Sequence, residues 1–99
     1  MTIHELVINA RARKCSDVHI SSGLPTVFRV NGKLIDCGFD IQPDEAENMI
    51  FSLLNEKQKK ELNSGNDVDF AFETHDGYRQ RVNVFRYKGK YAATIRLLN

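Results

Sequence analysis

Tryptophan is absent from this 99-residue sequence, and cysteine, proline and methionine occur only twice each. Two cysteines without a secretory context do not make a disulfide scaffold, so Cys15 and Cys37 are expected to be reduced thiols. The low proline content and six glycines argue against a low-complexity chain. With 41% hydrophobic and 27% charged residues, the composition predicts one globular domain.

Long apolar runs are also missing. The stretch from Met49 to Leu54 is among the longest, whereas a transmembrane helix needs about 20 apolar residues. Residues 1 to 20 lack the apolar segment and cleavage site of a signal peptide. We therefore expect a cytoplasmic protein with no membrane span.

The sequence lacks the motifs of catalysis and of metal binding. Its glycines are isolated, and nothing matches the nucleotide-binding pattern G-x-x-x-x-G-K-[ST]. We therefore expect no catalytic residues and no nucleotide hydrolysis by this chain alone. Its cysteines and histidines do not have paired zinc-ligand spacing, so neither a metal nor a cofactor of its own is expected. Asp17 and His19 should share one side of a strand, where they could hydrogen-bond locally.

The amino-terminal part combines a helix pattern with a hairpin pattern. Thr2 and Glu5 have the spacing of a capping box, and the following apolar residues repeat at helical intervals. Alternation from Asp17 to Ser21 predicts a strand, and Asn31-Gly32 is typical of a two-residue hairpin turn. The strands expected on either side of this turn are Thr26 to Asn31 and Lys33 to Asp36.

The remainder predicts two helices followed by three strands. Pro43 suits the first turn of a helix whose buried stripe ends at Leu54, and a second short helix spans Glu56 to Leu62. Asp76-Gly77 and Lys88-Gly89 mark two-residue reversals. These short connections predict an α+β fold, with a mostly antiparallel sheet and helices packed on one face. The expected strands are Asp67 to Thr74, Tyr78 to Tyr87 and Tyr91 to Leu98.

Charge is distributed unevenly. Acidic residues dominate from Asp36 to Asp76, whereas all charged side chains after Asp76 are basic. If Lys88 and Gly89 form a two-residue turn, residues equidistant from it face each other across the strands. Val82 then faces Ile95 and Val84 faces Ala93 on the core side, while Arg81 faces Arg96 on the opposite side.

The facing arginines, with Arg79 on the same side, predict an anion site. Like charges opposed across strands are unfavourable without compensation, so phosphate is a candidate ligand. Alternatively, the arginines lie on a solvated face, where they extend into water or pair with carboxylates of the neighbouring strand. The carboxylates in question are Asp67, Asp69 and Glu73.

Aromatic residues alternate with these basic residues, a pattern typical of single-strand nucleic-acid platforms. No RNP motif or GxxG loop accompanies them, and strands favour aromatic residues for other reasons. A stand-alone interaction or single-strand nucleic-acid-binding module that uses the basic carboxyl-terminal hairpin remains the alternative. The aromatic residues are Tyr78, Phe85, Tyr87 and Tyr91.

One stretch has a specific pattern. Residues 15 to 25 read CSDVHISSGLP, and residues 28 to 32 read FRVNG. Together they resemble the SDLHL(S)xGxPPxxRVxG segment of PilT-like ATPases of type IV pilus retraction, in the secretion ATPase superfamily. Thr26 replaces the second proline, and Gln80 stands where the family often has phenylalanine before Arg-Val-Asn. Further landmarks occur in the same order at residues 55–58, 67–72, 81–85 and 95–96.

The resemblance implies a PAS-like amino-terminal domain over residues 1–99, with a RecA-like ATPase core after it. It implies a regulatory and assembly role within a homohexamer that drives pilus retraction in twitching motility. ATP and Mg are then expected in the core, and the partners are cores of its own and neighbouring subunits and inner-membrane proteins at the pilus base. On this view Arg81 and Arg96, with Arg79 as a weaker addition, contribute to bound ATP.

Overall fold

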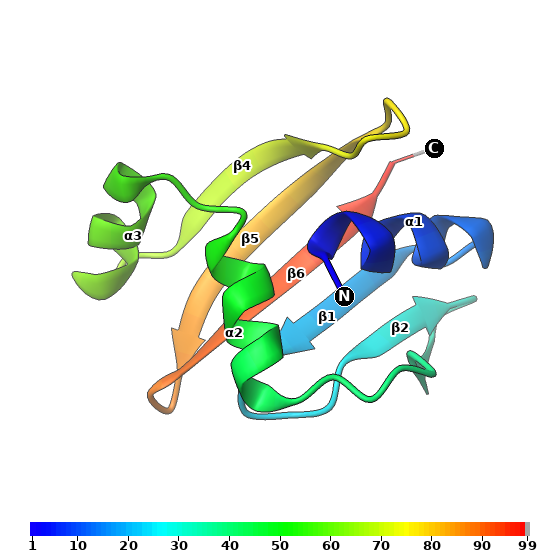
Figure 1. Ribbon diagram of the computed structural model, residues 1–99, viewed down its shortest axis with the longest axis horizontal. Helices are drawn as coiled ribbons and strands as arrows, with labels where there is room; N and C mark the ends of the chain where they lie inside the picture. Colours follow the sequence, from blue (N-terminus) through cyan, green and yellow to red (C-terminus); the bar gives the residue numbers. More distant parts are fainter. Residues whose placement is uncertain (99) are drawn as a thin grey trace.

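The computed structural model describes residues 1–98, within which three helices and one six-stranded sheet are found (Figure 1). The helices are α1 (Ile3–Ala12), α2 (Pro43–Phe51) and α3 (Glu56–Asn63). The strands are β1 (Asp17–Ser21), β2 (Val27–Val30), β3 (Lys33–Asp36), β4 (Val68–Glu73), β5 (Arg79–Tyr87) and β6 (Lys90–Leu97).

The sheet has the strand order β3-β2-β1-β6-β5-β4, and every pair of neighbouring strands is antiparallel. This arrangement confirms the predicted α+β class and antiparallel sheet. Its centre is the pair β1 and β6, which come from opposite ends of the sequence and lie side by side in Figure 1. The first and last strands are therefore joined by contacts that no short turn dictates.

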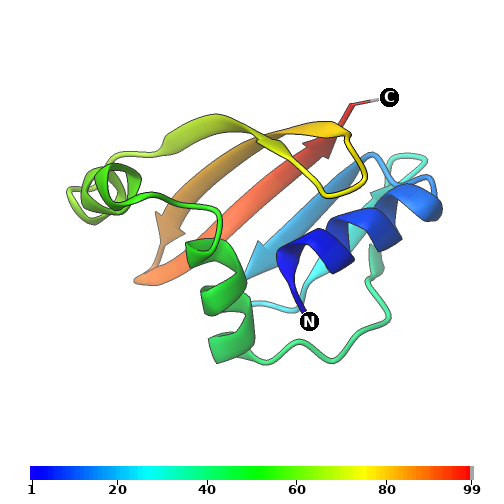
Figure 2. The ribbon, with the colours of Figure 1, turned by 45° about the horizontal axis from the view of Figure 1, so that its top comes forward.

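Helices α1 and α2 cover one face of this sheet (Figure 2). The capping box of α1 is confirmed, because the Thr2 hydroxyl accepts a hydrogen bond from the Glu5 amide and the Glu5 carboxylate accepts one from the Thr2 amide. The apolar side of α1 is buried against the sheet, as its spacing predicts. α3 lies beside β4 and β5 and contributes the buried Leu62.

Turn geometry confirms the register predicted for the last hairpin. Lys88 and Gly89 both have positive φ angles, 51° and 77°, as a two-residue turn that matches the strand twist requires. Arg81 faces Arg96, and the two predicted core pairs, around Val82 and Val84, are buried on the helix side. In the hairpin at Asn31-Gly32, both turn residues likewise have positive φ angles.

Several predicted boundaries are wrong. The reversal at Asp76-Gly77 is a longer loop, because the Thr74 amide bonds to the Tyr78 carbonyl around it. α2 ends at Phe51, so Leu54 is buried from beyond the helix rather than from its stripe. Most strand ends differ by one residue from the expected limits, since backbone pairing stops where the turns begin.

Gln80 is a polar residue within the core. Its side chain is fully buried, and its amide nitrogen donates to Thr74 Oγ1 at 3.3 Å. Among residues 1–98, no donor reaches its carbonyl oxygen Oε1. A buried acceptor without a partner loses the hydrogen bonds that it makes to water in the unfolded chain.

Gln80→Met should therefore raise the free energy of unfolding by about 1 kcal/mol, because the volume is kept and the unpaired oxygen is removed. Urea denaturation measures the change. The control is Gln42→Met. The Gln42 side chain is exposed and its amide donates to Asp40, so the free energy of unfolding of this variant should stay within about 0.5 kcal/mol of the parent. A loss of stability in Gln80→Met would show that the Gln80 amide is fully paired in solution.

Candidate functional site

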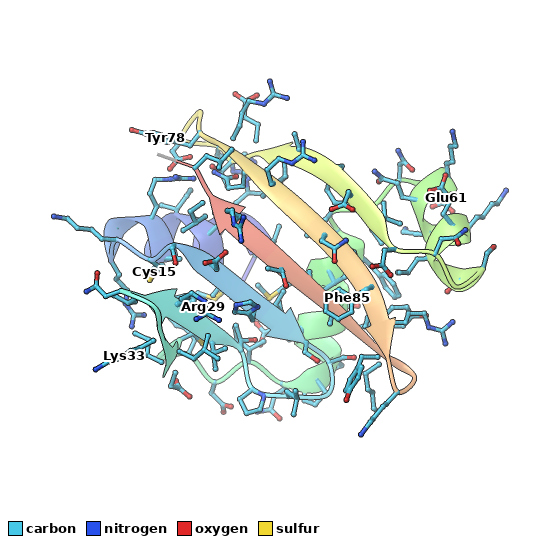
Figure 3. All side chains as sticks on the ribbon, turned by 180° about the vertical axis from the view of Figure 1, so that it is seen from behind. Cys15, Arg29, Lys33, Glu61, Tyr78 and Phe85 are labelled. Atoms are coloured by element: carbon cyan, nitrogen blue, oxygen red, sulfur yellow. The ribbon has the colours of Figure 1, made fainter. Side chains whose placement is uncertain are left out.

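One face of the sheet is left uncovered by helices. Figure 3 shows this face, with the labelled Arg29 and Phe85 on it. Alternation along each strand separates the two sides, so that Val82 and Val84 point to the core and Arg81 and Asn83 point away. Residues far apart in the sequence thus gather on one open surface.

A single row of side chains crosses the six strands on this face. The pairing register places three arginines and one aspartate next to one another in its middle. Three positive charges against one negative charge leave the row positive. We call it the arginine row; from β3 to β4 its members are Leu34, Arg29, Asp17, Arg96, Arg81 and Ala71.

The arginines predicted as a site are brought together. Arg81 and Arg96 are directly opposite across β5 and β6, and both are exposed. Arg79 lies on the same side of β5, two residues before Arg81, and faces Glu73 of β4 next to the arginine row. Within residues 1–98, neither Arg79 nor Arg81 forms an ion pair, so the predicted pairing with carboxylates of β4 is wrong for these two.

Asp17 of β1 compensates part of this charge. Its Oδ1 lies 3.4 Å from Arg96 Nε and its Oδ2 lies 3.9 Å from Arg29 Nε. Ser16 Oγ donates to the same Oδ2 at 2.8 Å. The predicted local bond between Asp17 and His19 is not made, because each side chain finds its partner elsewhere.

An open hollow of about 280 Å³ lies above the paired arginines. Arg81 and Arg96 form one side of it, and Asn83 and Thr94 supply neutral polar groups. Asp69 is the acidic residue of its lining. Guanidinium groups with free donors beside amide and hydroxyl groups suit an anion that carries several oxygen atoms.

His19 lies one row further along the same face. Its Nδ1 is 3.4 Å from Thr94 Oγ1, and its buried Nε2 has no hydrogen-bond partner within residues 1–98. Burial lowers the pKa of His19 below its ordinary value; the Asp17 charge opposes this shift and the Arg29 charge adds to it. His19 is therefore held neutral further into the acidic range than a free histidine.

Stability should fall as the pH is lowered from 7 to 5.5. Burial, together with the neighbouring His75, also lowers the pKa of His4, so the unfolded chain binds protons at His4 and His19 that the folded chain does not. The loss begins near pH 6.5 and amounts to less than about 1.4 kcal/mol per pH unit for each histidine. Urea unfolding at several pH values measures it. The double variant of His4→Gln and His19→Gln should flatten this dependence, and an unchanged slope would contradict the assignment.

Three further features of residues 1–98 concern metal ligands, thiols and long apolar helices. No group of three metal-ligating side chains is found within residues 1–98. Cys15 and Cys37 are both buried free thiols. No helix in the same range is long and apolar enough to span a membrane.

The four aromatic residues of the nucleic-acid alternative do not form one platform. Phe85 and Tyr87 line a hollow on the open face, whereas Tyr91 packs edge-on against Phe51 of α2. The Tyr78 ring is stacked under the Arg11 guanidinium at 4.3 Å. Successive bases of a single strand need stacking surfaces along one path, which this distribution does not provide.

Sequence patterns alone do not predict the two other charged members of the arginine row, Arg29 and Asp17. In the sequence, Arg29 is only a polar residue between Phe28 and Val30, and no local pattern connects Asp17 with Arg96. The hairpin turns fix β5 against β6 and β2 against β3, but only the long-range pairing of β1 with β6 joins the two hairpins. Predicting their positions requires knowing that β1 pairs with β2 on one side and with β6 on the other.

Comparison with known proteins identifies relatives of this chain in sequence and in fold. No protein-family model matches the sequence. The chain is 30% identical over 99 residues to the type IV pilus retraction ATPase PilT of Pseudomonas aeruginosa, covering 99% of this chain and 29% of that protein. It superimposes on a crystal structure of the pilus retraction motor PilT with bound ADP with a TM-score of 0.89, at 29% identity, over 100% of this chain and 29% of the other.

In sequence and in fold, the chain is similar to the amino-terminal region of PilT. The Legionella pneumophila ATPase DotB has the same fold, with a TM-score of 0.81 and 25% identity over 100% of this chain and 30% of DotB. The chain thus spans about a third or less of the relatives that it matches. The resemblance to PilT-like ATPases inferred from the sequence is confirmed over the length of this chain.

Proposed function

We propose that this chain is the amino-terminal regulatory and assembly domain of a hexameric type IV pilus retraction ATPase. In this role Arg81 and Arg96, with Arg79 at the margin, contribute to ATP bound by a RecA-like core. The observation that carries the proposal is the uncovered face on which Arg81 and Arg96 stand opposite each other. Within residues 1–98, Arg81 has no ion-pair partner and Arg96 shares only its Nε, with Asp17. Similarity to PilT over the whole chain supports the same role.

Arginine suits this task chemically. Its guanidinium stays protonated and can donate two parallel hydrogen bonds to phosphate oxygens. Phosphoryl transfer spreads negative charge over these oxygens, and a positioned arginine stabilises it. The PilT structure matched by this chain contains ADP, which supports a nucleotide as the ligand of the complete protein.

The domain by itself is proposed to be non-catalytic. It has no G-x-x-x-x-G-K-[ST] segment, so ATP and Mg would be held by the core, and the domain would supply arginines and dock against cores of its own and neighbouring subunits. In the assembled machine it would lie in the cytoplasm, at the inner face of the inner membrane, near the pilus-base proteins. A pilus assembly or secretion ATPase is the related alternative, which the DotB match supports.

The natural coding sequence that includes residues 1–99 tests this proposal. A Walker A segment G-x-x-x-x-G-K-[ST] is expected between a strand and a helix, within about 200 residues after Asn99. A coding sequence that stops at Asn99 would refute the motor function. A stand-alone binding module, with salt-sensitive affinity for single-stranded nucleic acid, would then take its place.

A further inference from the structure

Asp17 lies at the centre of the arginine row, between Arg29 and Arg96. It is only 7% exposed although it projects from the uncovered face. We infer that Asp17 is a positioning residue, which holds Arg96 in the orientation that receives the polyphosphate of a nucleotide. This inference rests on the function proposed above, and it assigns a task to an acidic residue whose charge alone would repel the ligand.

The Asp17 carboxylate is itself fixed in place. Ser16 Oγ donates to Oδ2, and Arg29 Nε forms an ion pair with the same oxygen at 3.9 Å. Arg29 is in turn held through Nη1, which donates to the Gly32 carbonyl at 3.0 Å in the adjacent turn. Two contacts on Oδ2 thus leave Oδ1 free to accept from Arg96.

Among residues 1–98, Arg96 is held only through its Nε. Its Nε lies 3.4 Å from Asp17 Oδ1, and its side chain is otherwise 71% exposed. An exposed arginine without a partner samples many rotamers, and binding must then restrict them. A bond through Nε restricts this motion while both terminal amino groups stay available, beside the hollow that Arg81 and Arg96 share.

Charge and order have opposite effects at this position, which makes the inference testable. Removing the Asp17 charge makes the row more positive, so a purely electrostatic role predicts tighter anion binding. Removing it also releases Arg96, so a positioning role predicts weaker binding. Asp17→Asn keeps the size of the side chain and separates the two effects.

The experiment is an NMR study of Arg96 in the 99-residue chain. Without ligand, Asp17→Asn should speed hydrogen exchange at Arg96 Nε about tenfold, since a charge-assisted bond is lost. In a titration with inorganic tripolyphosphate, Asp17→Asn should weaken binding several-fold. Arg96→Gln should then weaken binding less in the Asp17→Asn background than in the parent chain.

Asp69→Asn is the matched control, because Asp69 lines the same hollow and the change in charge is identical. This variant should leave exchange at Arg96 Nε unchanged and should tighten tripolyphosphate binding slightly. Equal exchange in the parent chain and Asp17→Asn, or tighter binding by Asp17→Asn, would overturn the positioning role. Slowed exchange in a parent chain that does not bind tripolyphosphate would retain the positioning of Arg96 and count against the nucleotide function instead.

Discussion

Arg81→Ala is expected, on the function proposed above, to lower kcat for ATP hydrolysis by the protein that contains this domain on the order of 10²- to 10³-fold. The reason is that Arg81 has no ion-pair partner within residues 1–98 and faces Arg96, so its donors are free for phosphate. Its loss should leave the domain intact, with a free energy of unfolding within about 0.5 kcal/mol of the parent. A steady-state ATPase assay and urea unfolding of the 99-residue chain measure the two quantities.

Arg86→Ala is the control for this prediction. Arg86 is on the same strand, but it lies on the opposite side, where its guanidinium is 5.5 Å from the centre of the Tyr91 ring. The same loss of charge at Arg86 should change kcat less than about threefold. Equal effects of the two variants would mean that net charge, rather than the arginine row, supports hydrolysis.

Phe28→Ala should lower the free energy of unfolding by about 3 to 5 kcal/mol, because the ring is fully buried and its removal leaves a cavity. Stabilities of small domains lie at about 5 to 15 kcal/mol, so this single change removes a large part of the total. Phe28 also anchors β2 against β1 beside Val18, which places Arg29 next to Asp17. Urea denaturation measures the loss.

The comparison variant for the core is Ile35→Ala. Ile35 faces Phe28 across β2 and β3 but is 38% exposed, so its truncation should cost about 1 kcal/mol or less. Similar losses for Phe28→Ala and Ile35→Ala would contradict the assignment of β2 to the core and of β3 to a solvated edge.

Local signals in the sequence predict much of this fold. The capping box at Thr2 and Glu5 and the turns at Asn31-Gly32 and Lys88-Gly89 all depend on residues near one another in the chain, and all three are confirmed. The second turn also predicts that Arg81 and Arg96 face each other. A two-residue turn leaves no freedom of register, which is why this part of the site follows from sequence alone.

The remaining part of the site depends on long-range pairing. Asp17 reaches Arg96 because β1 inserts between β2 and β6, and no turn links β1 to β6. Hydrophobic patterning predicts that Val18 and Ile95 are buried, but many strand orders would bury them equally well. The contact between Asp17 and Arg96 therefore does not follow from the sequence, whereas the position of Arg96 opposite Arg81 does.

Arg81 and Arg96 are proposed above to contribute to a nucleotide bound by the complete protein. A cryo-EM structure of that protein with bound ATP analogue tests it most directly. We expect phosphate oxygens within about 3 Å of guanidinium nitrogens of both Arg81 and Arg96. A nucleotide whose phosphates lie elsewhere, with these arginines facing solvent or another protein surface, would contradict it.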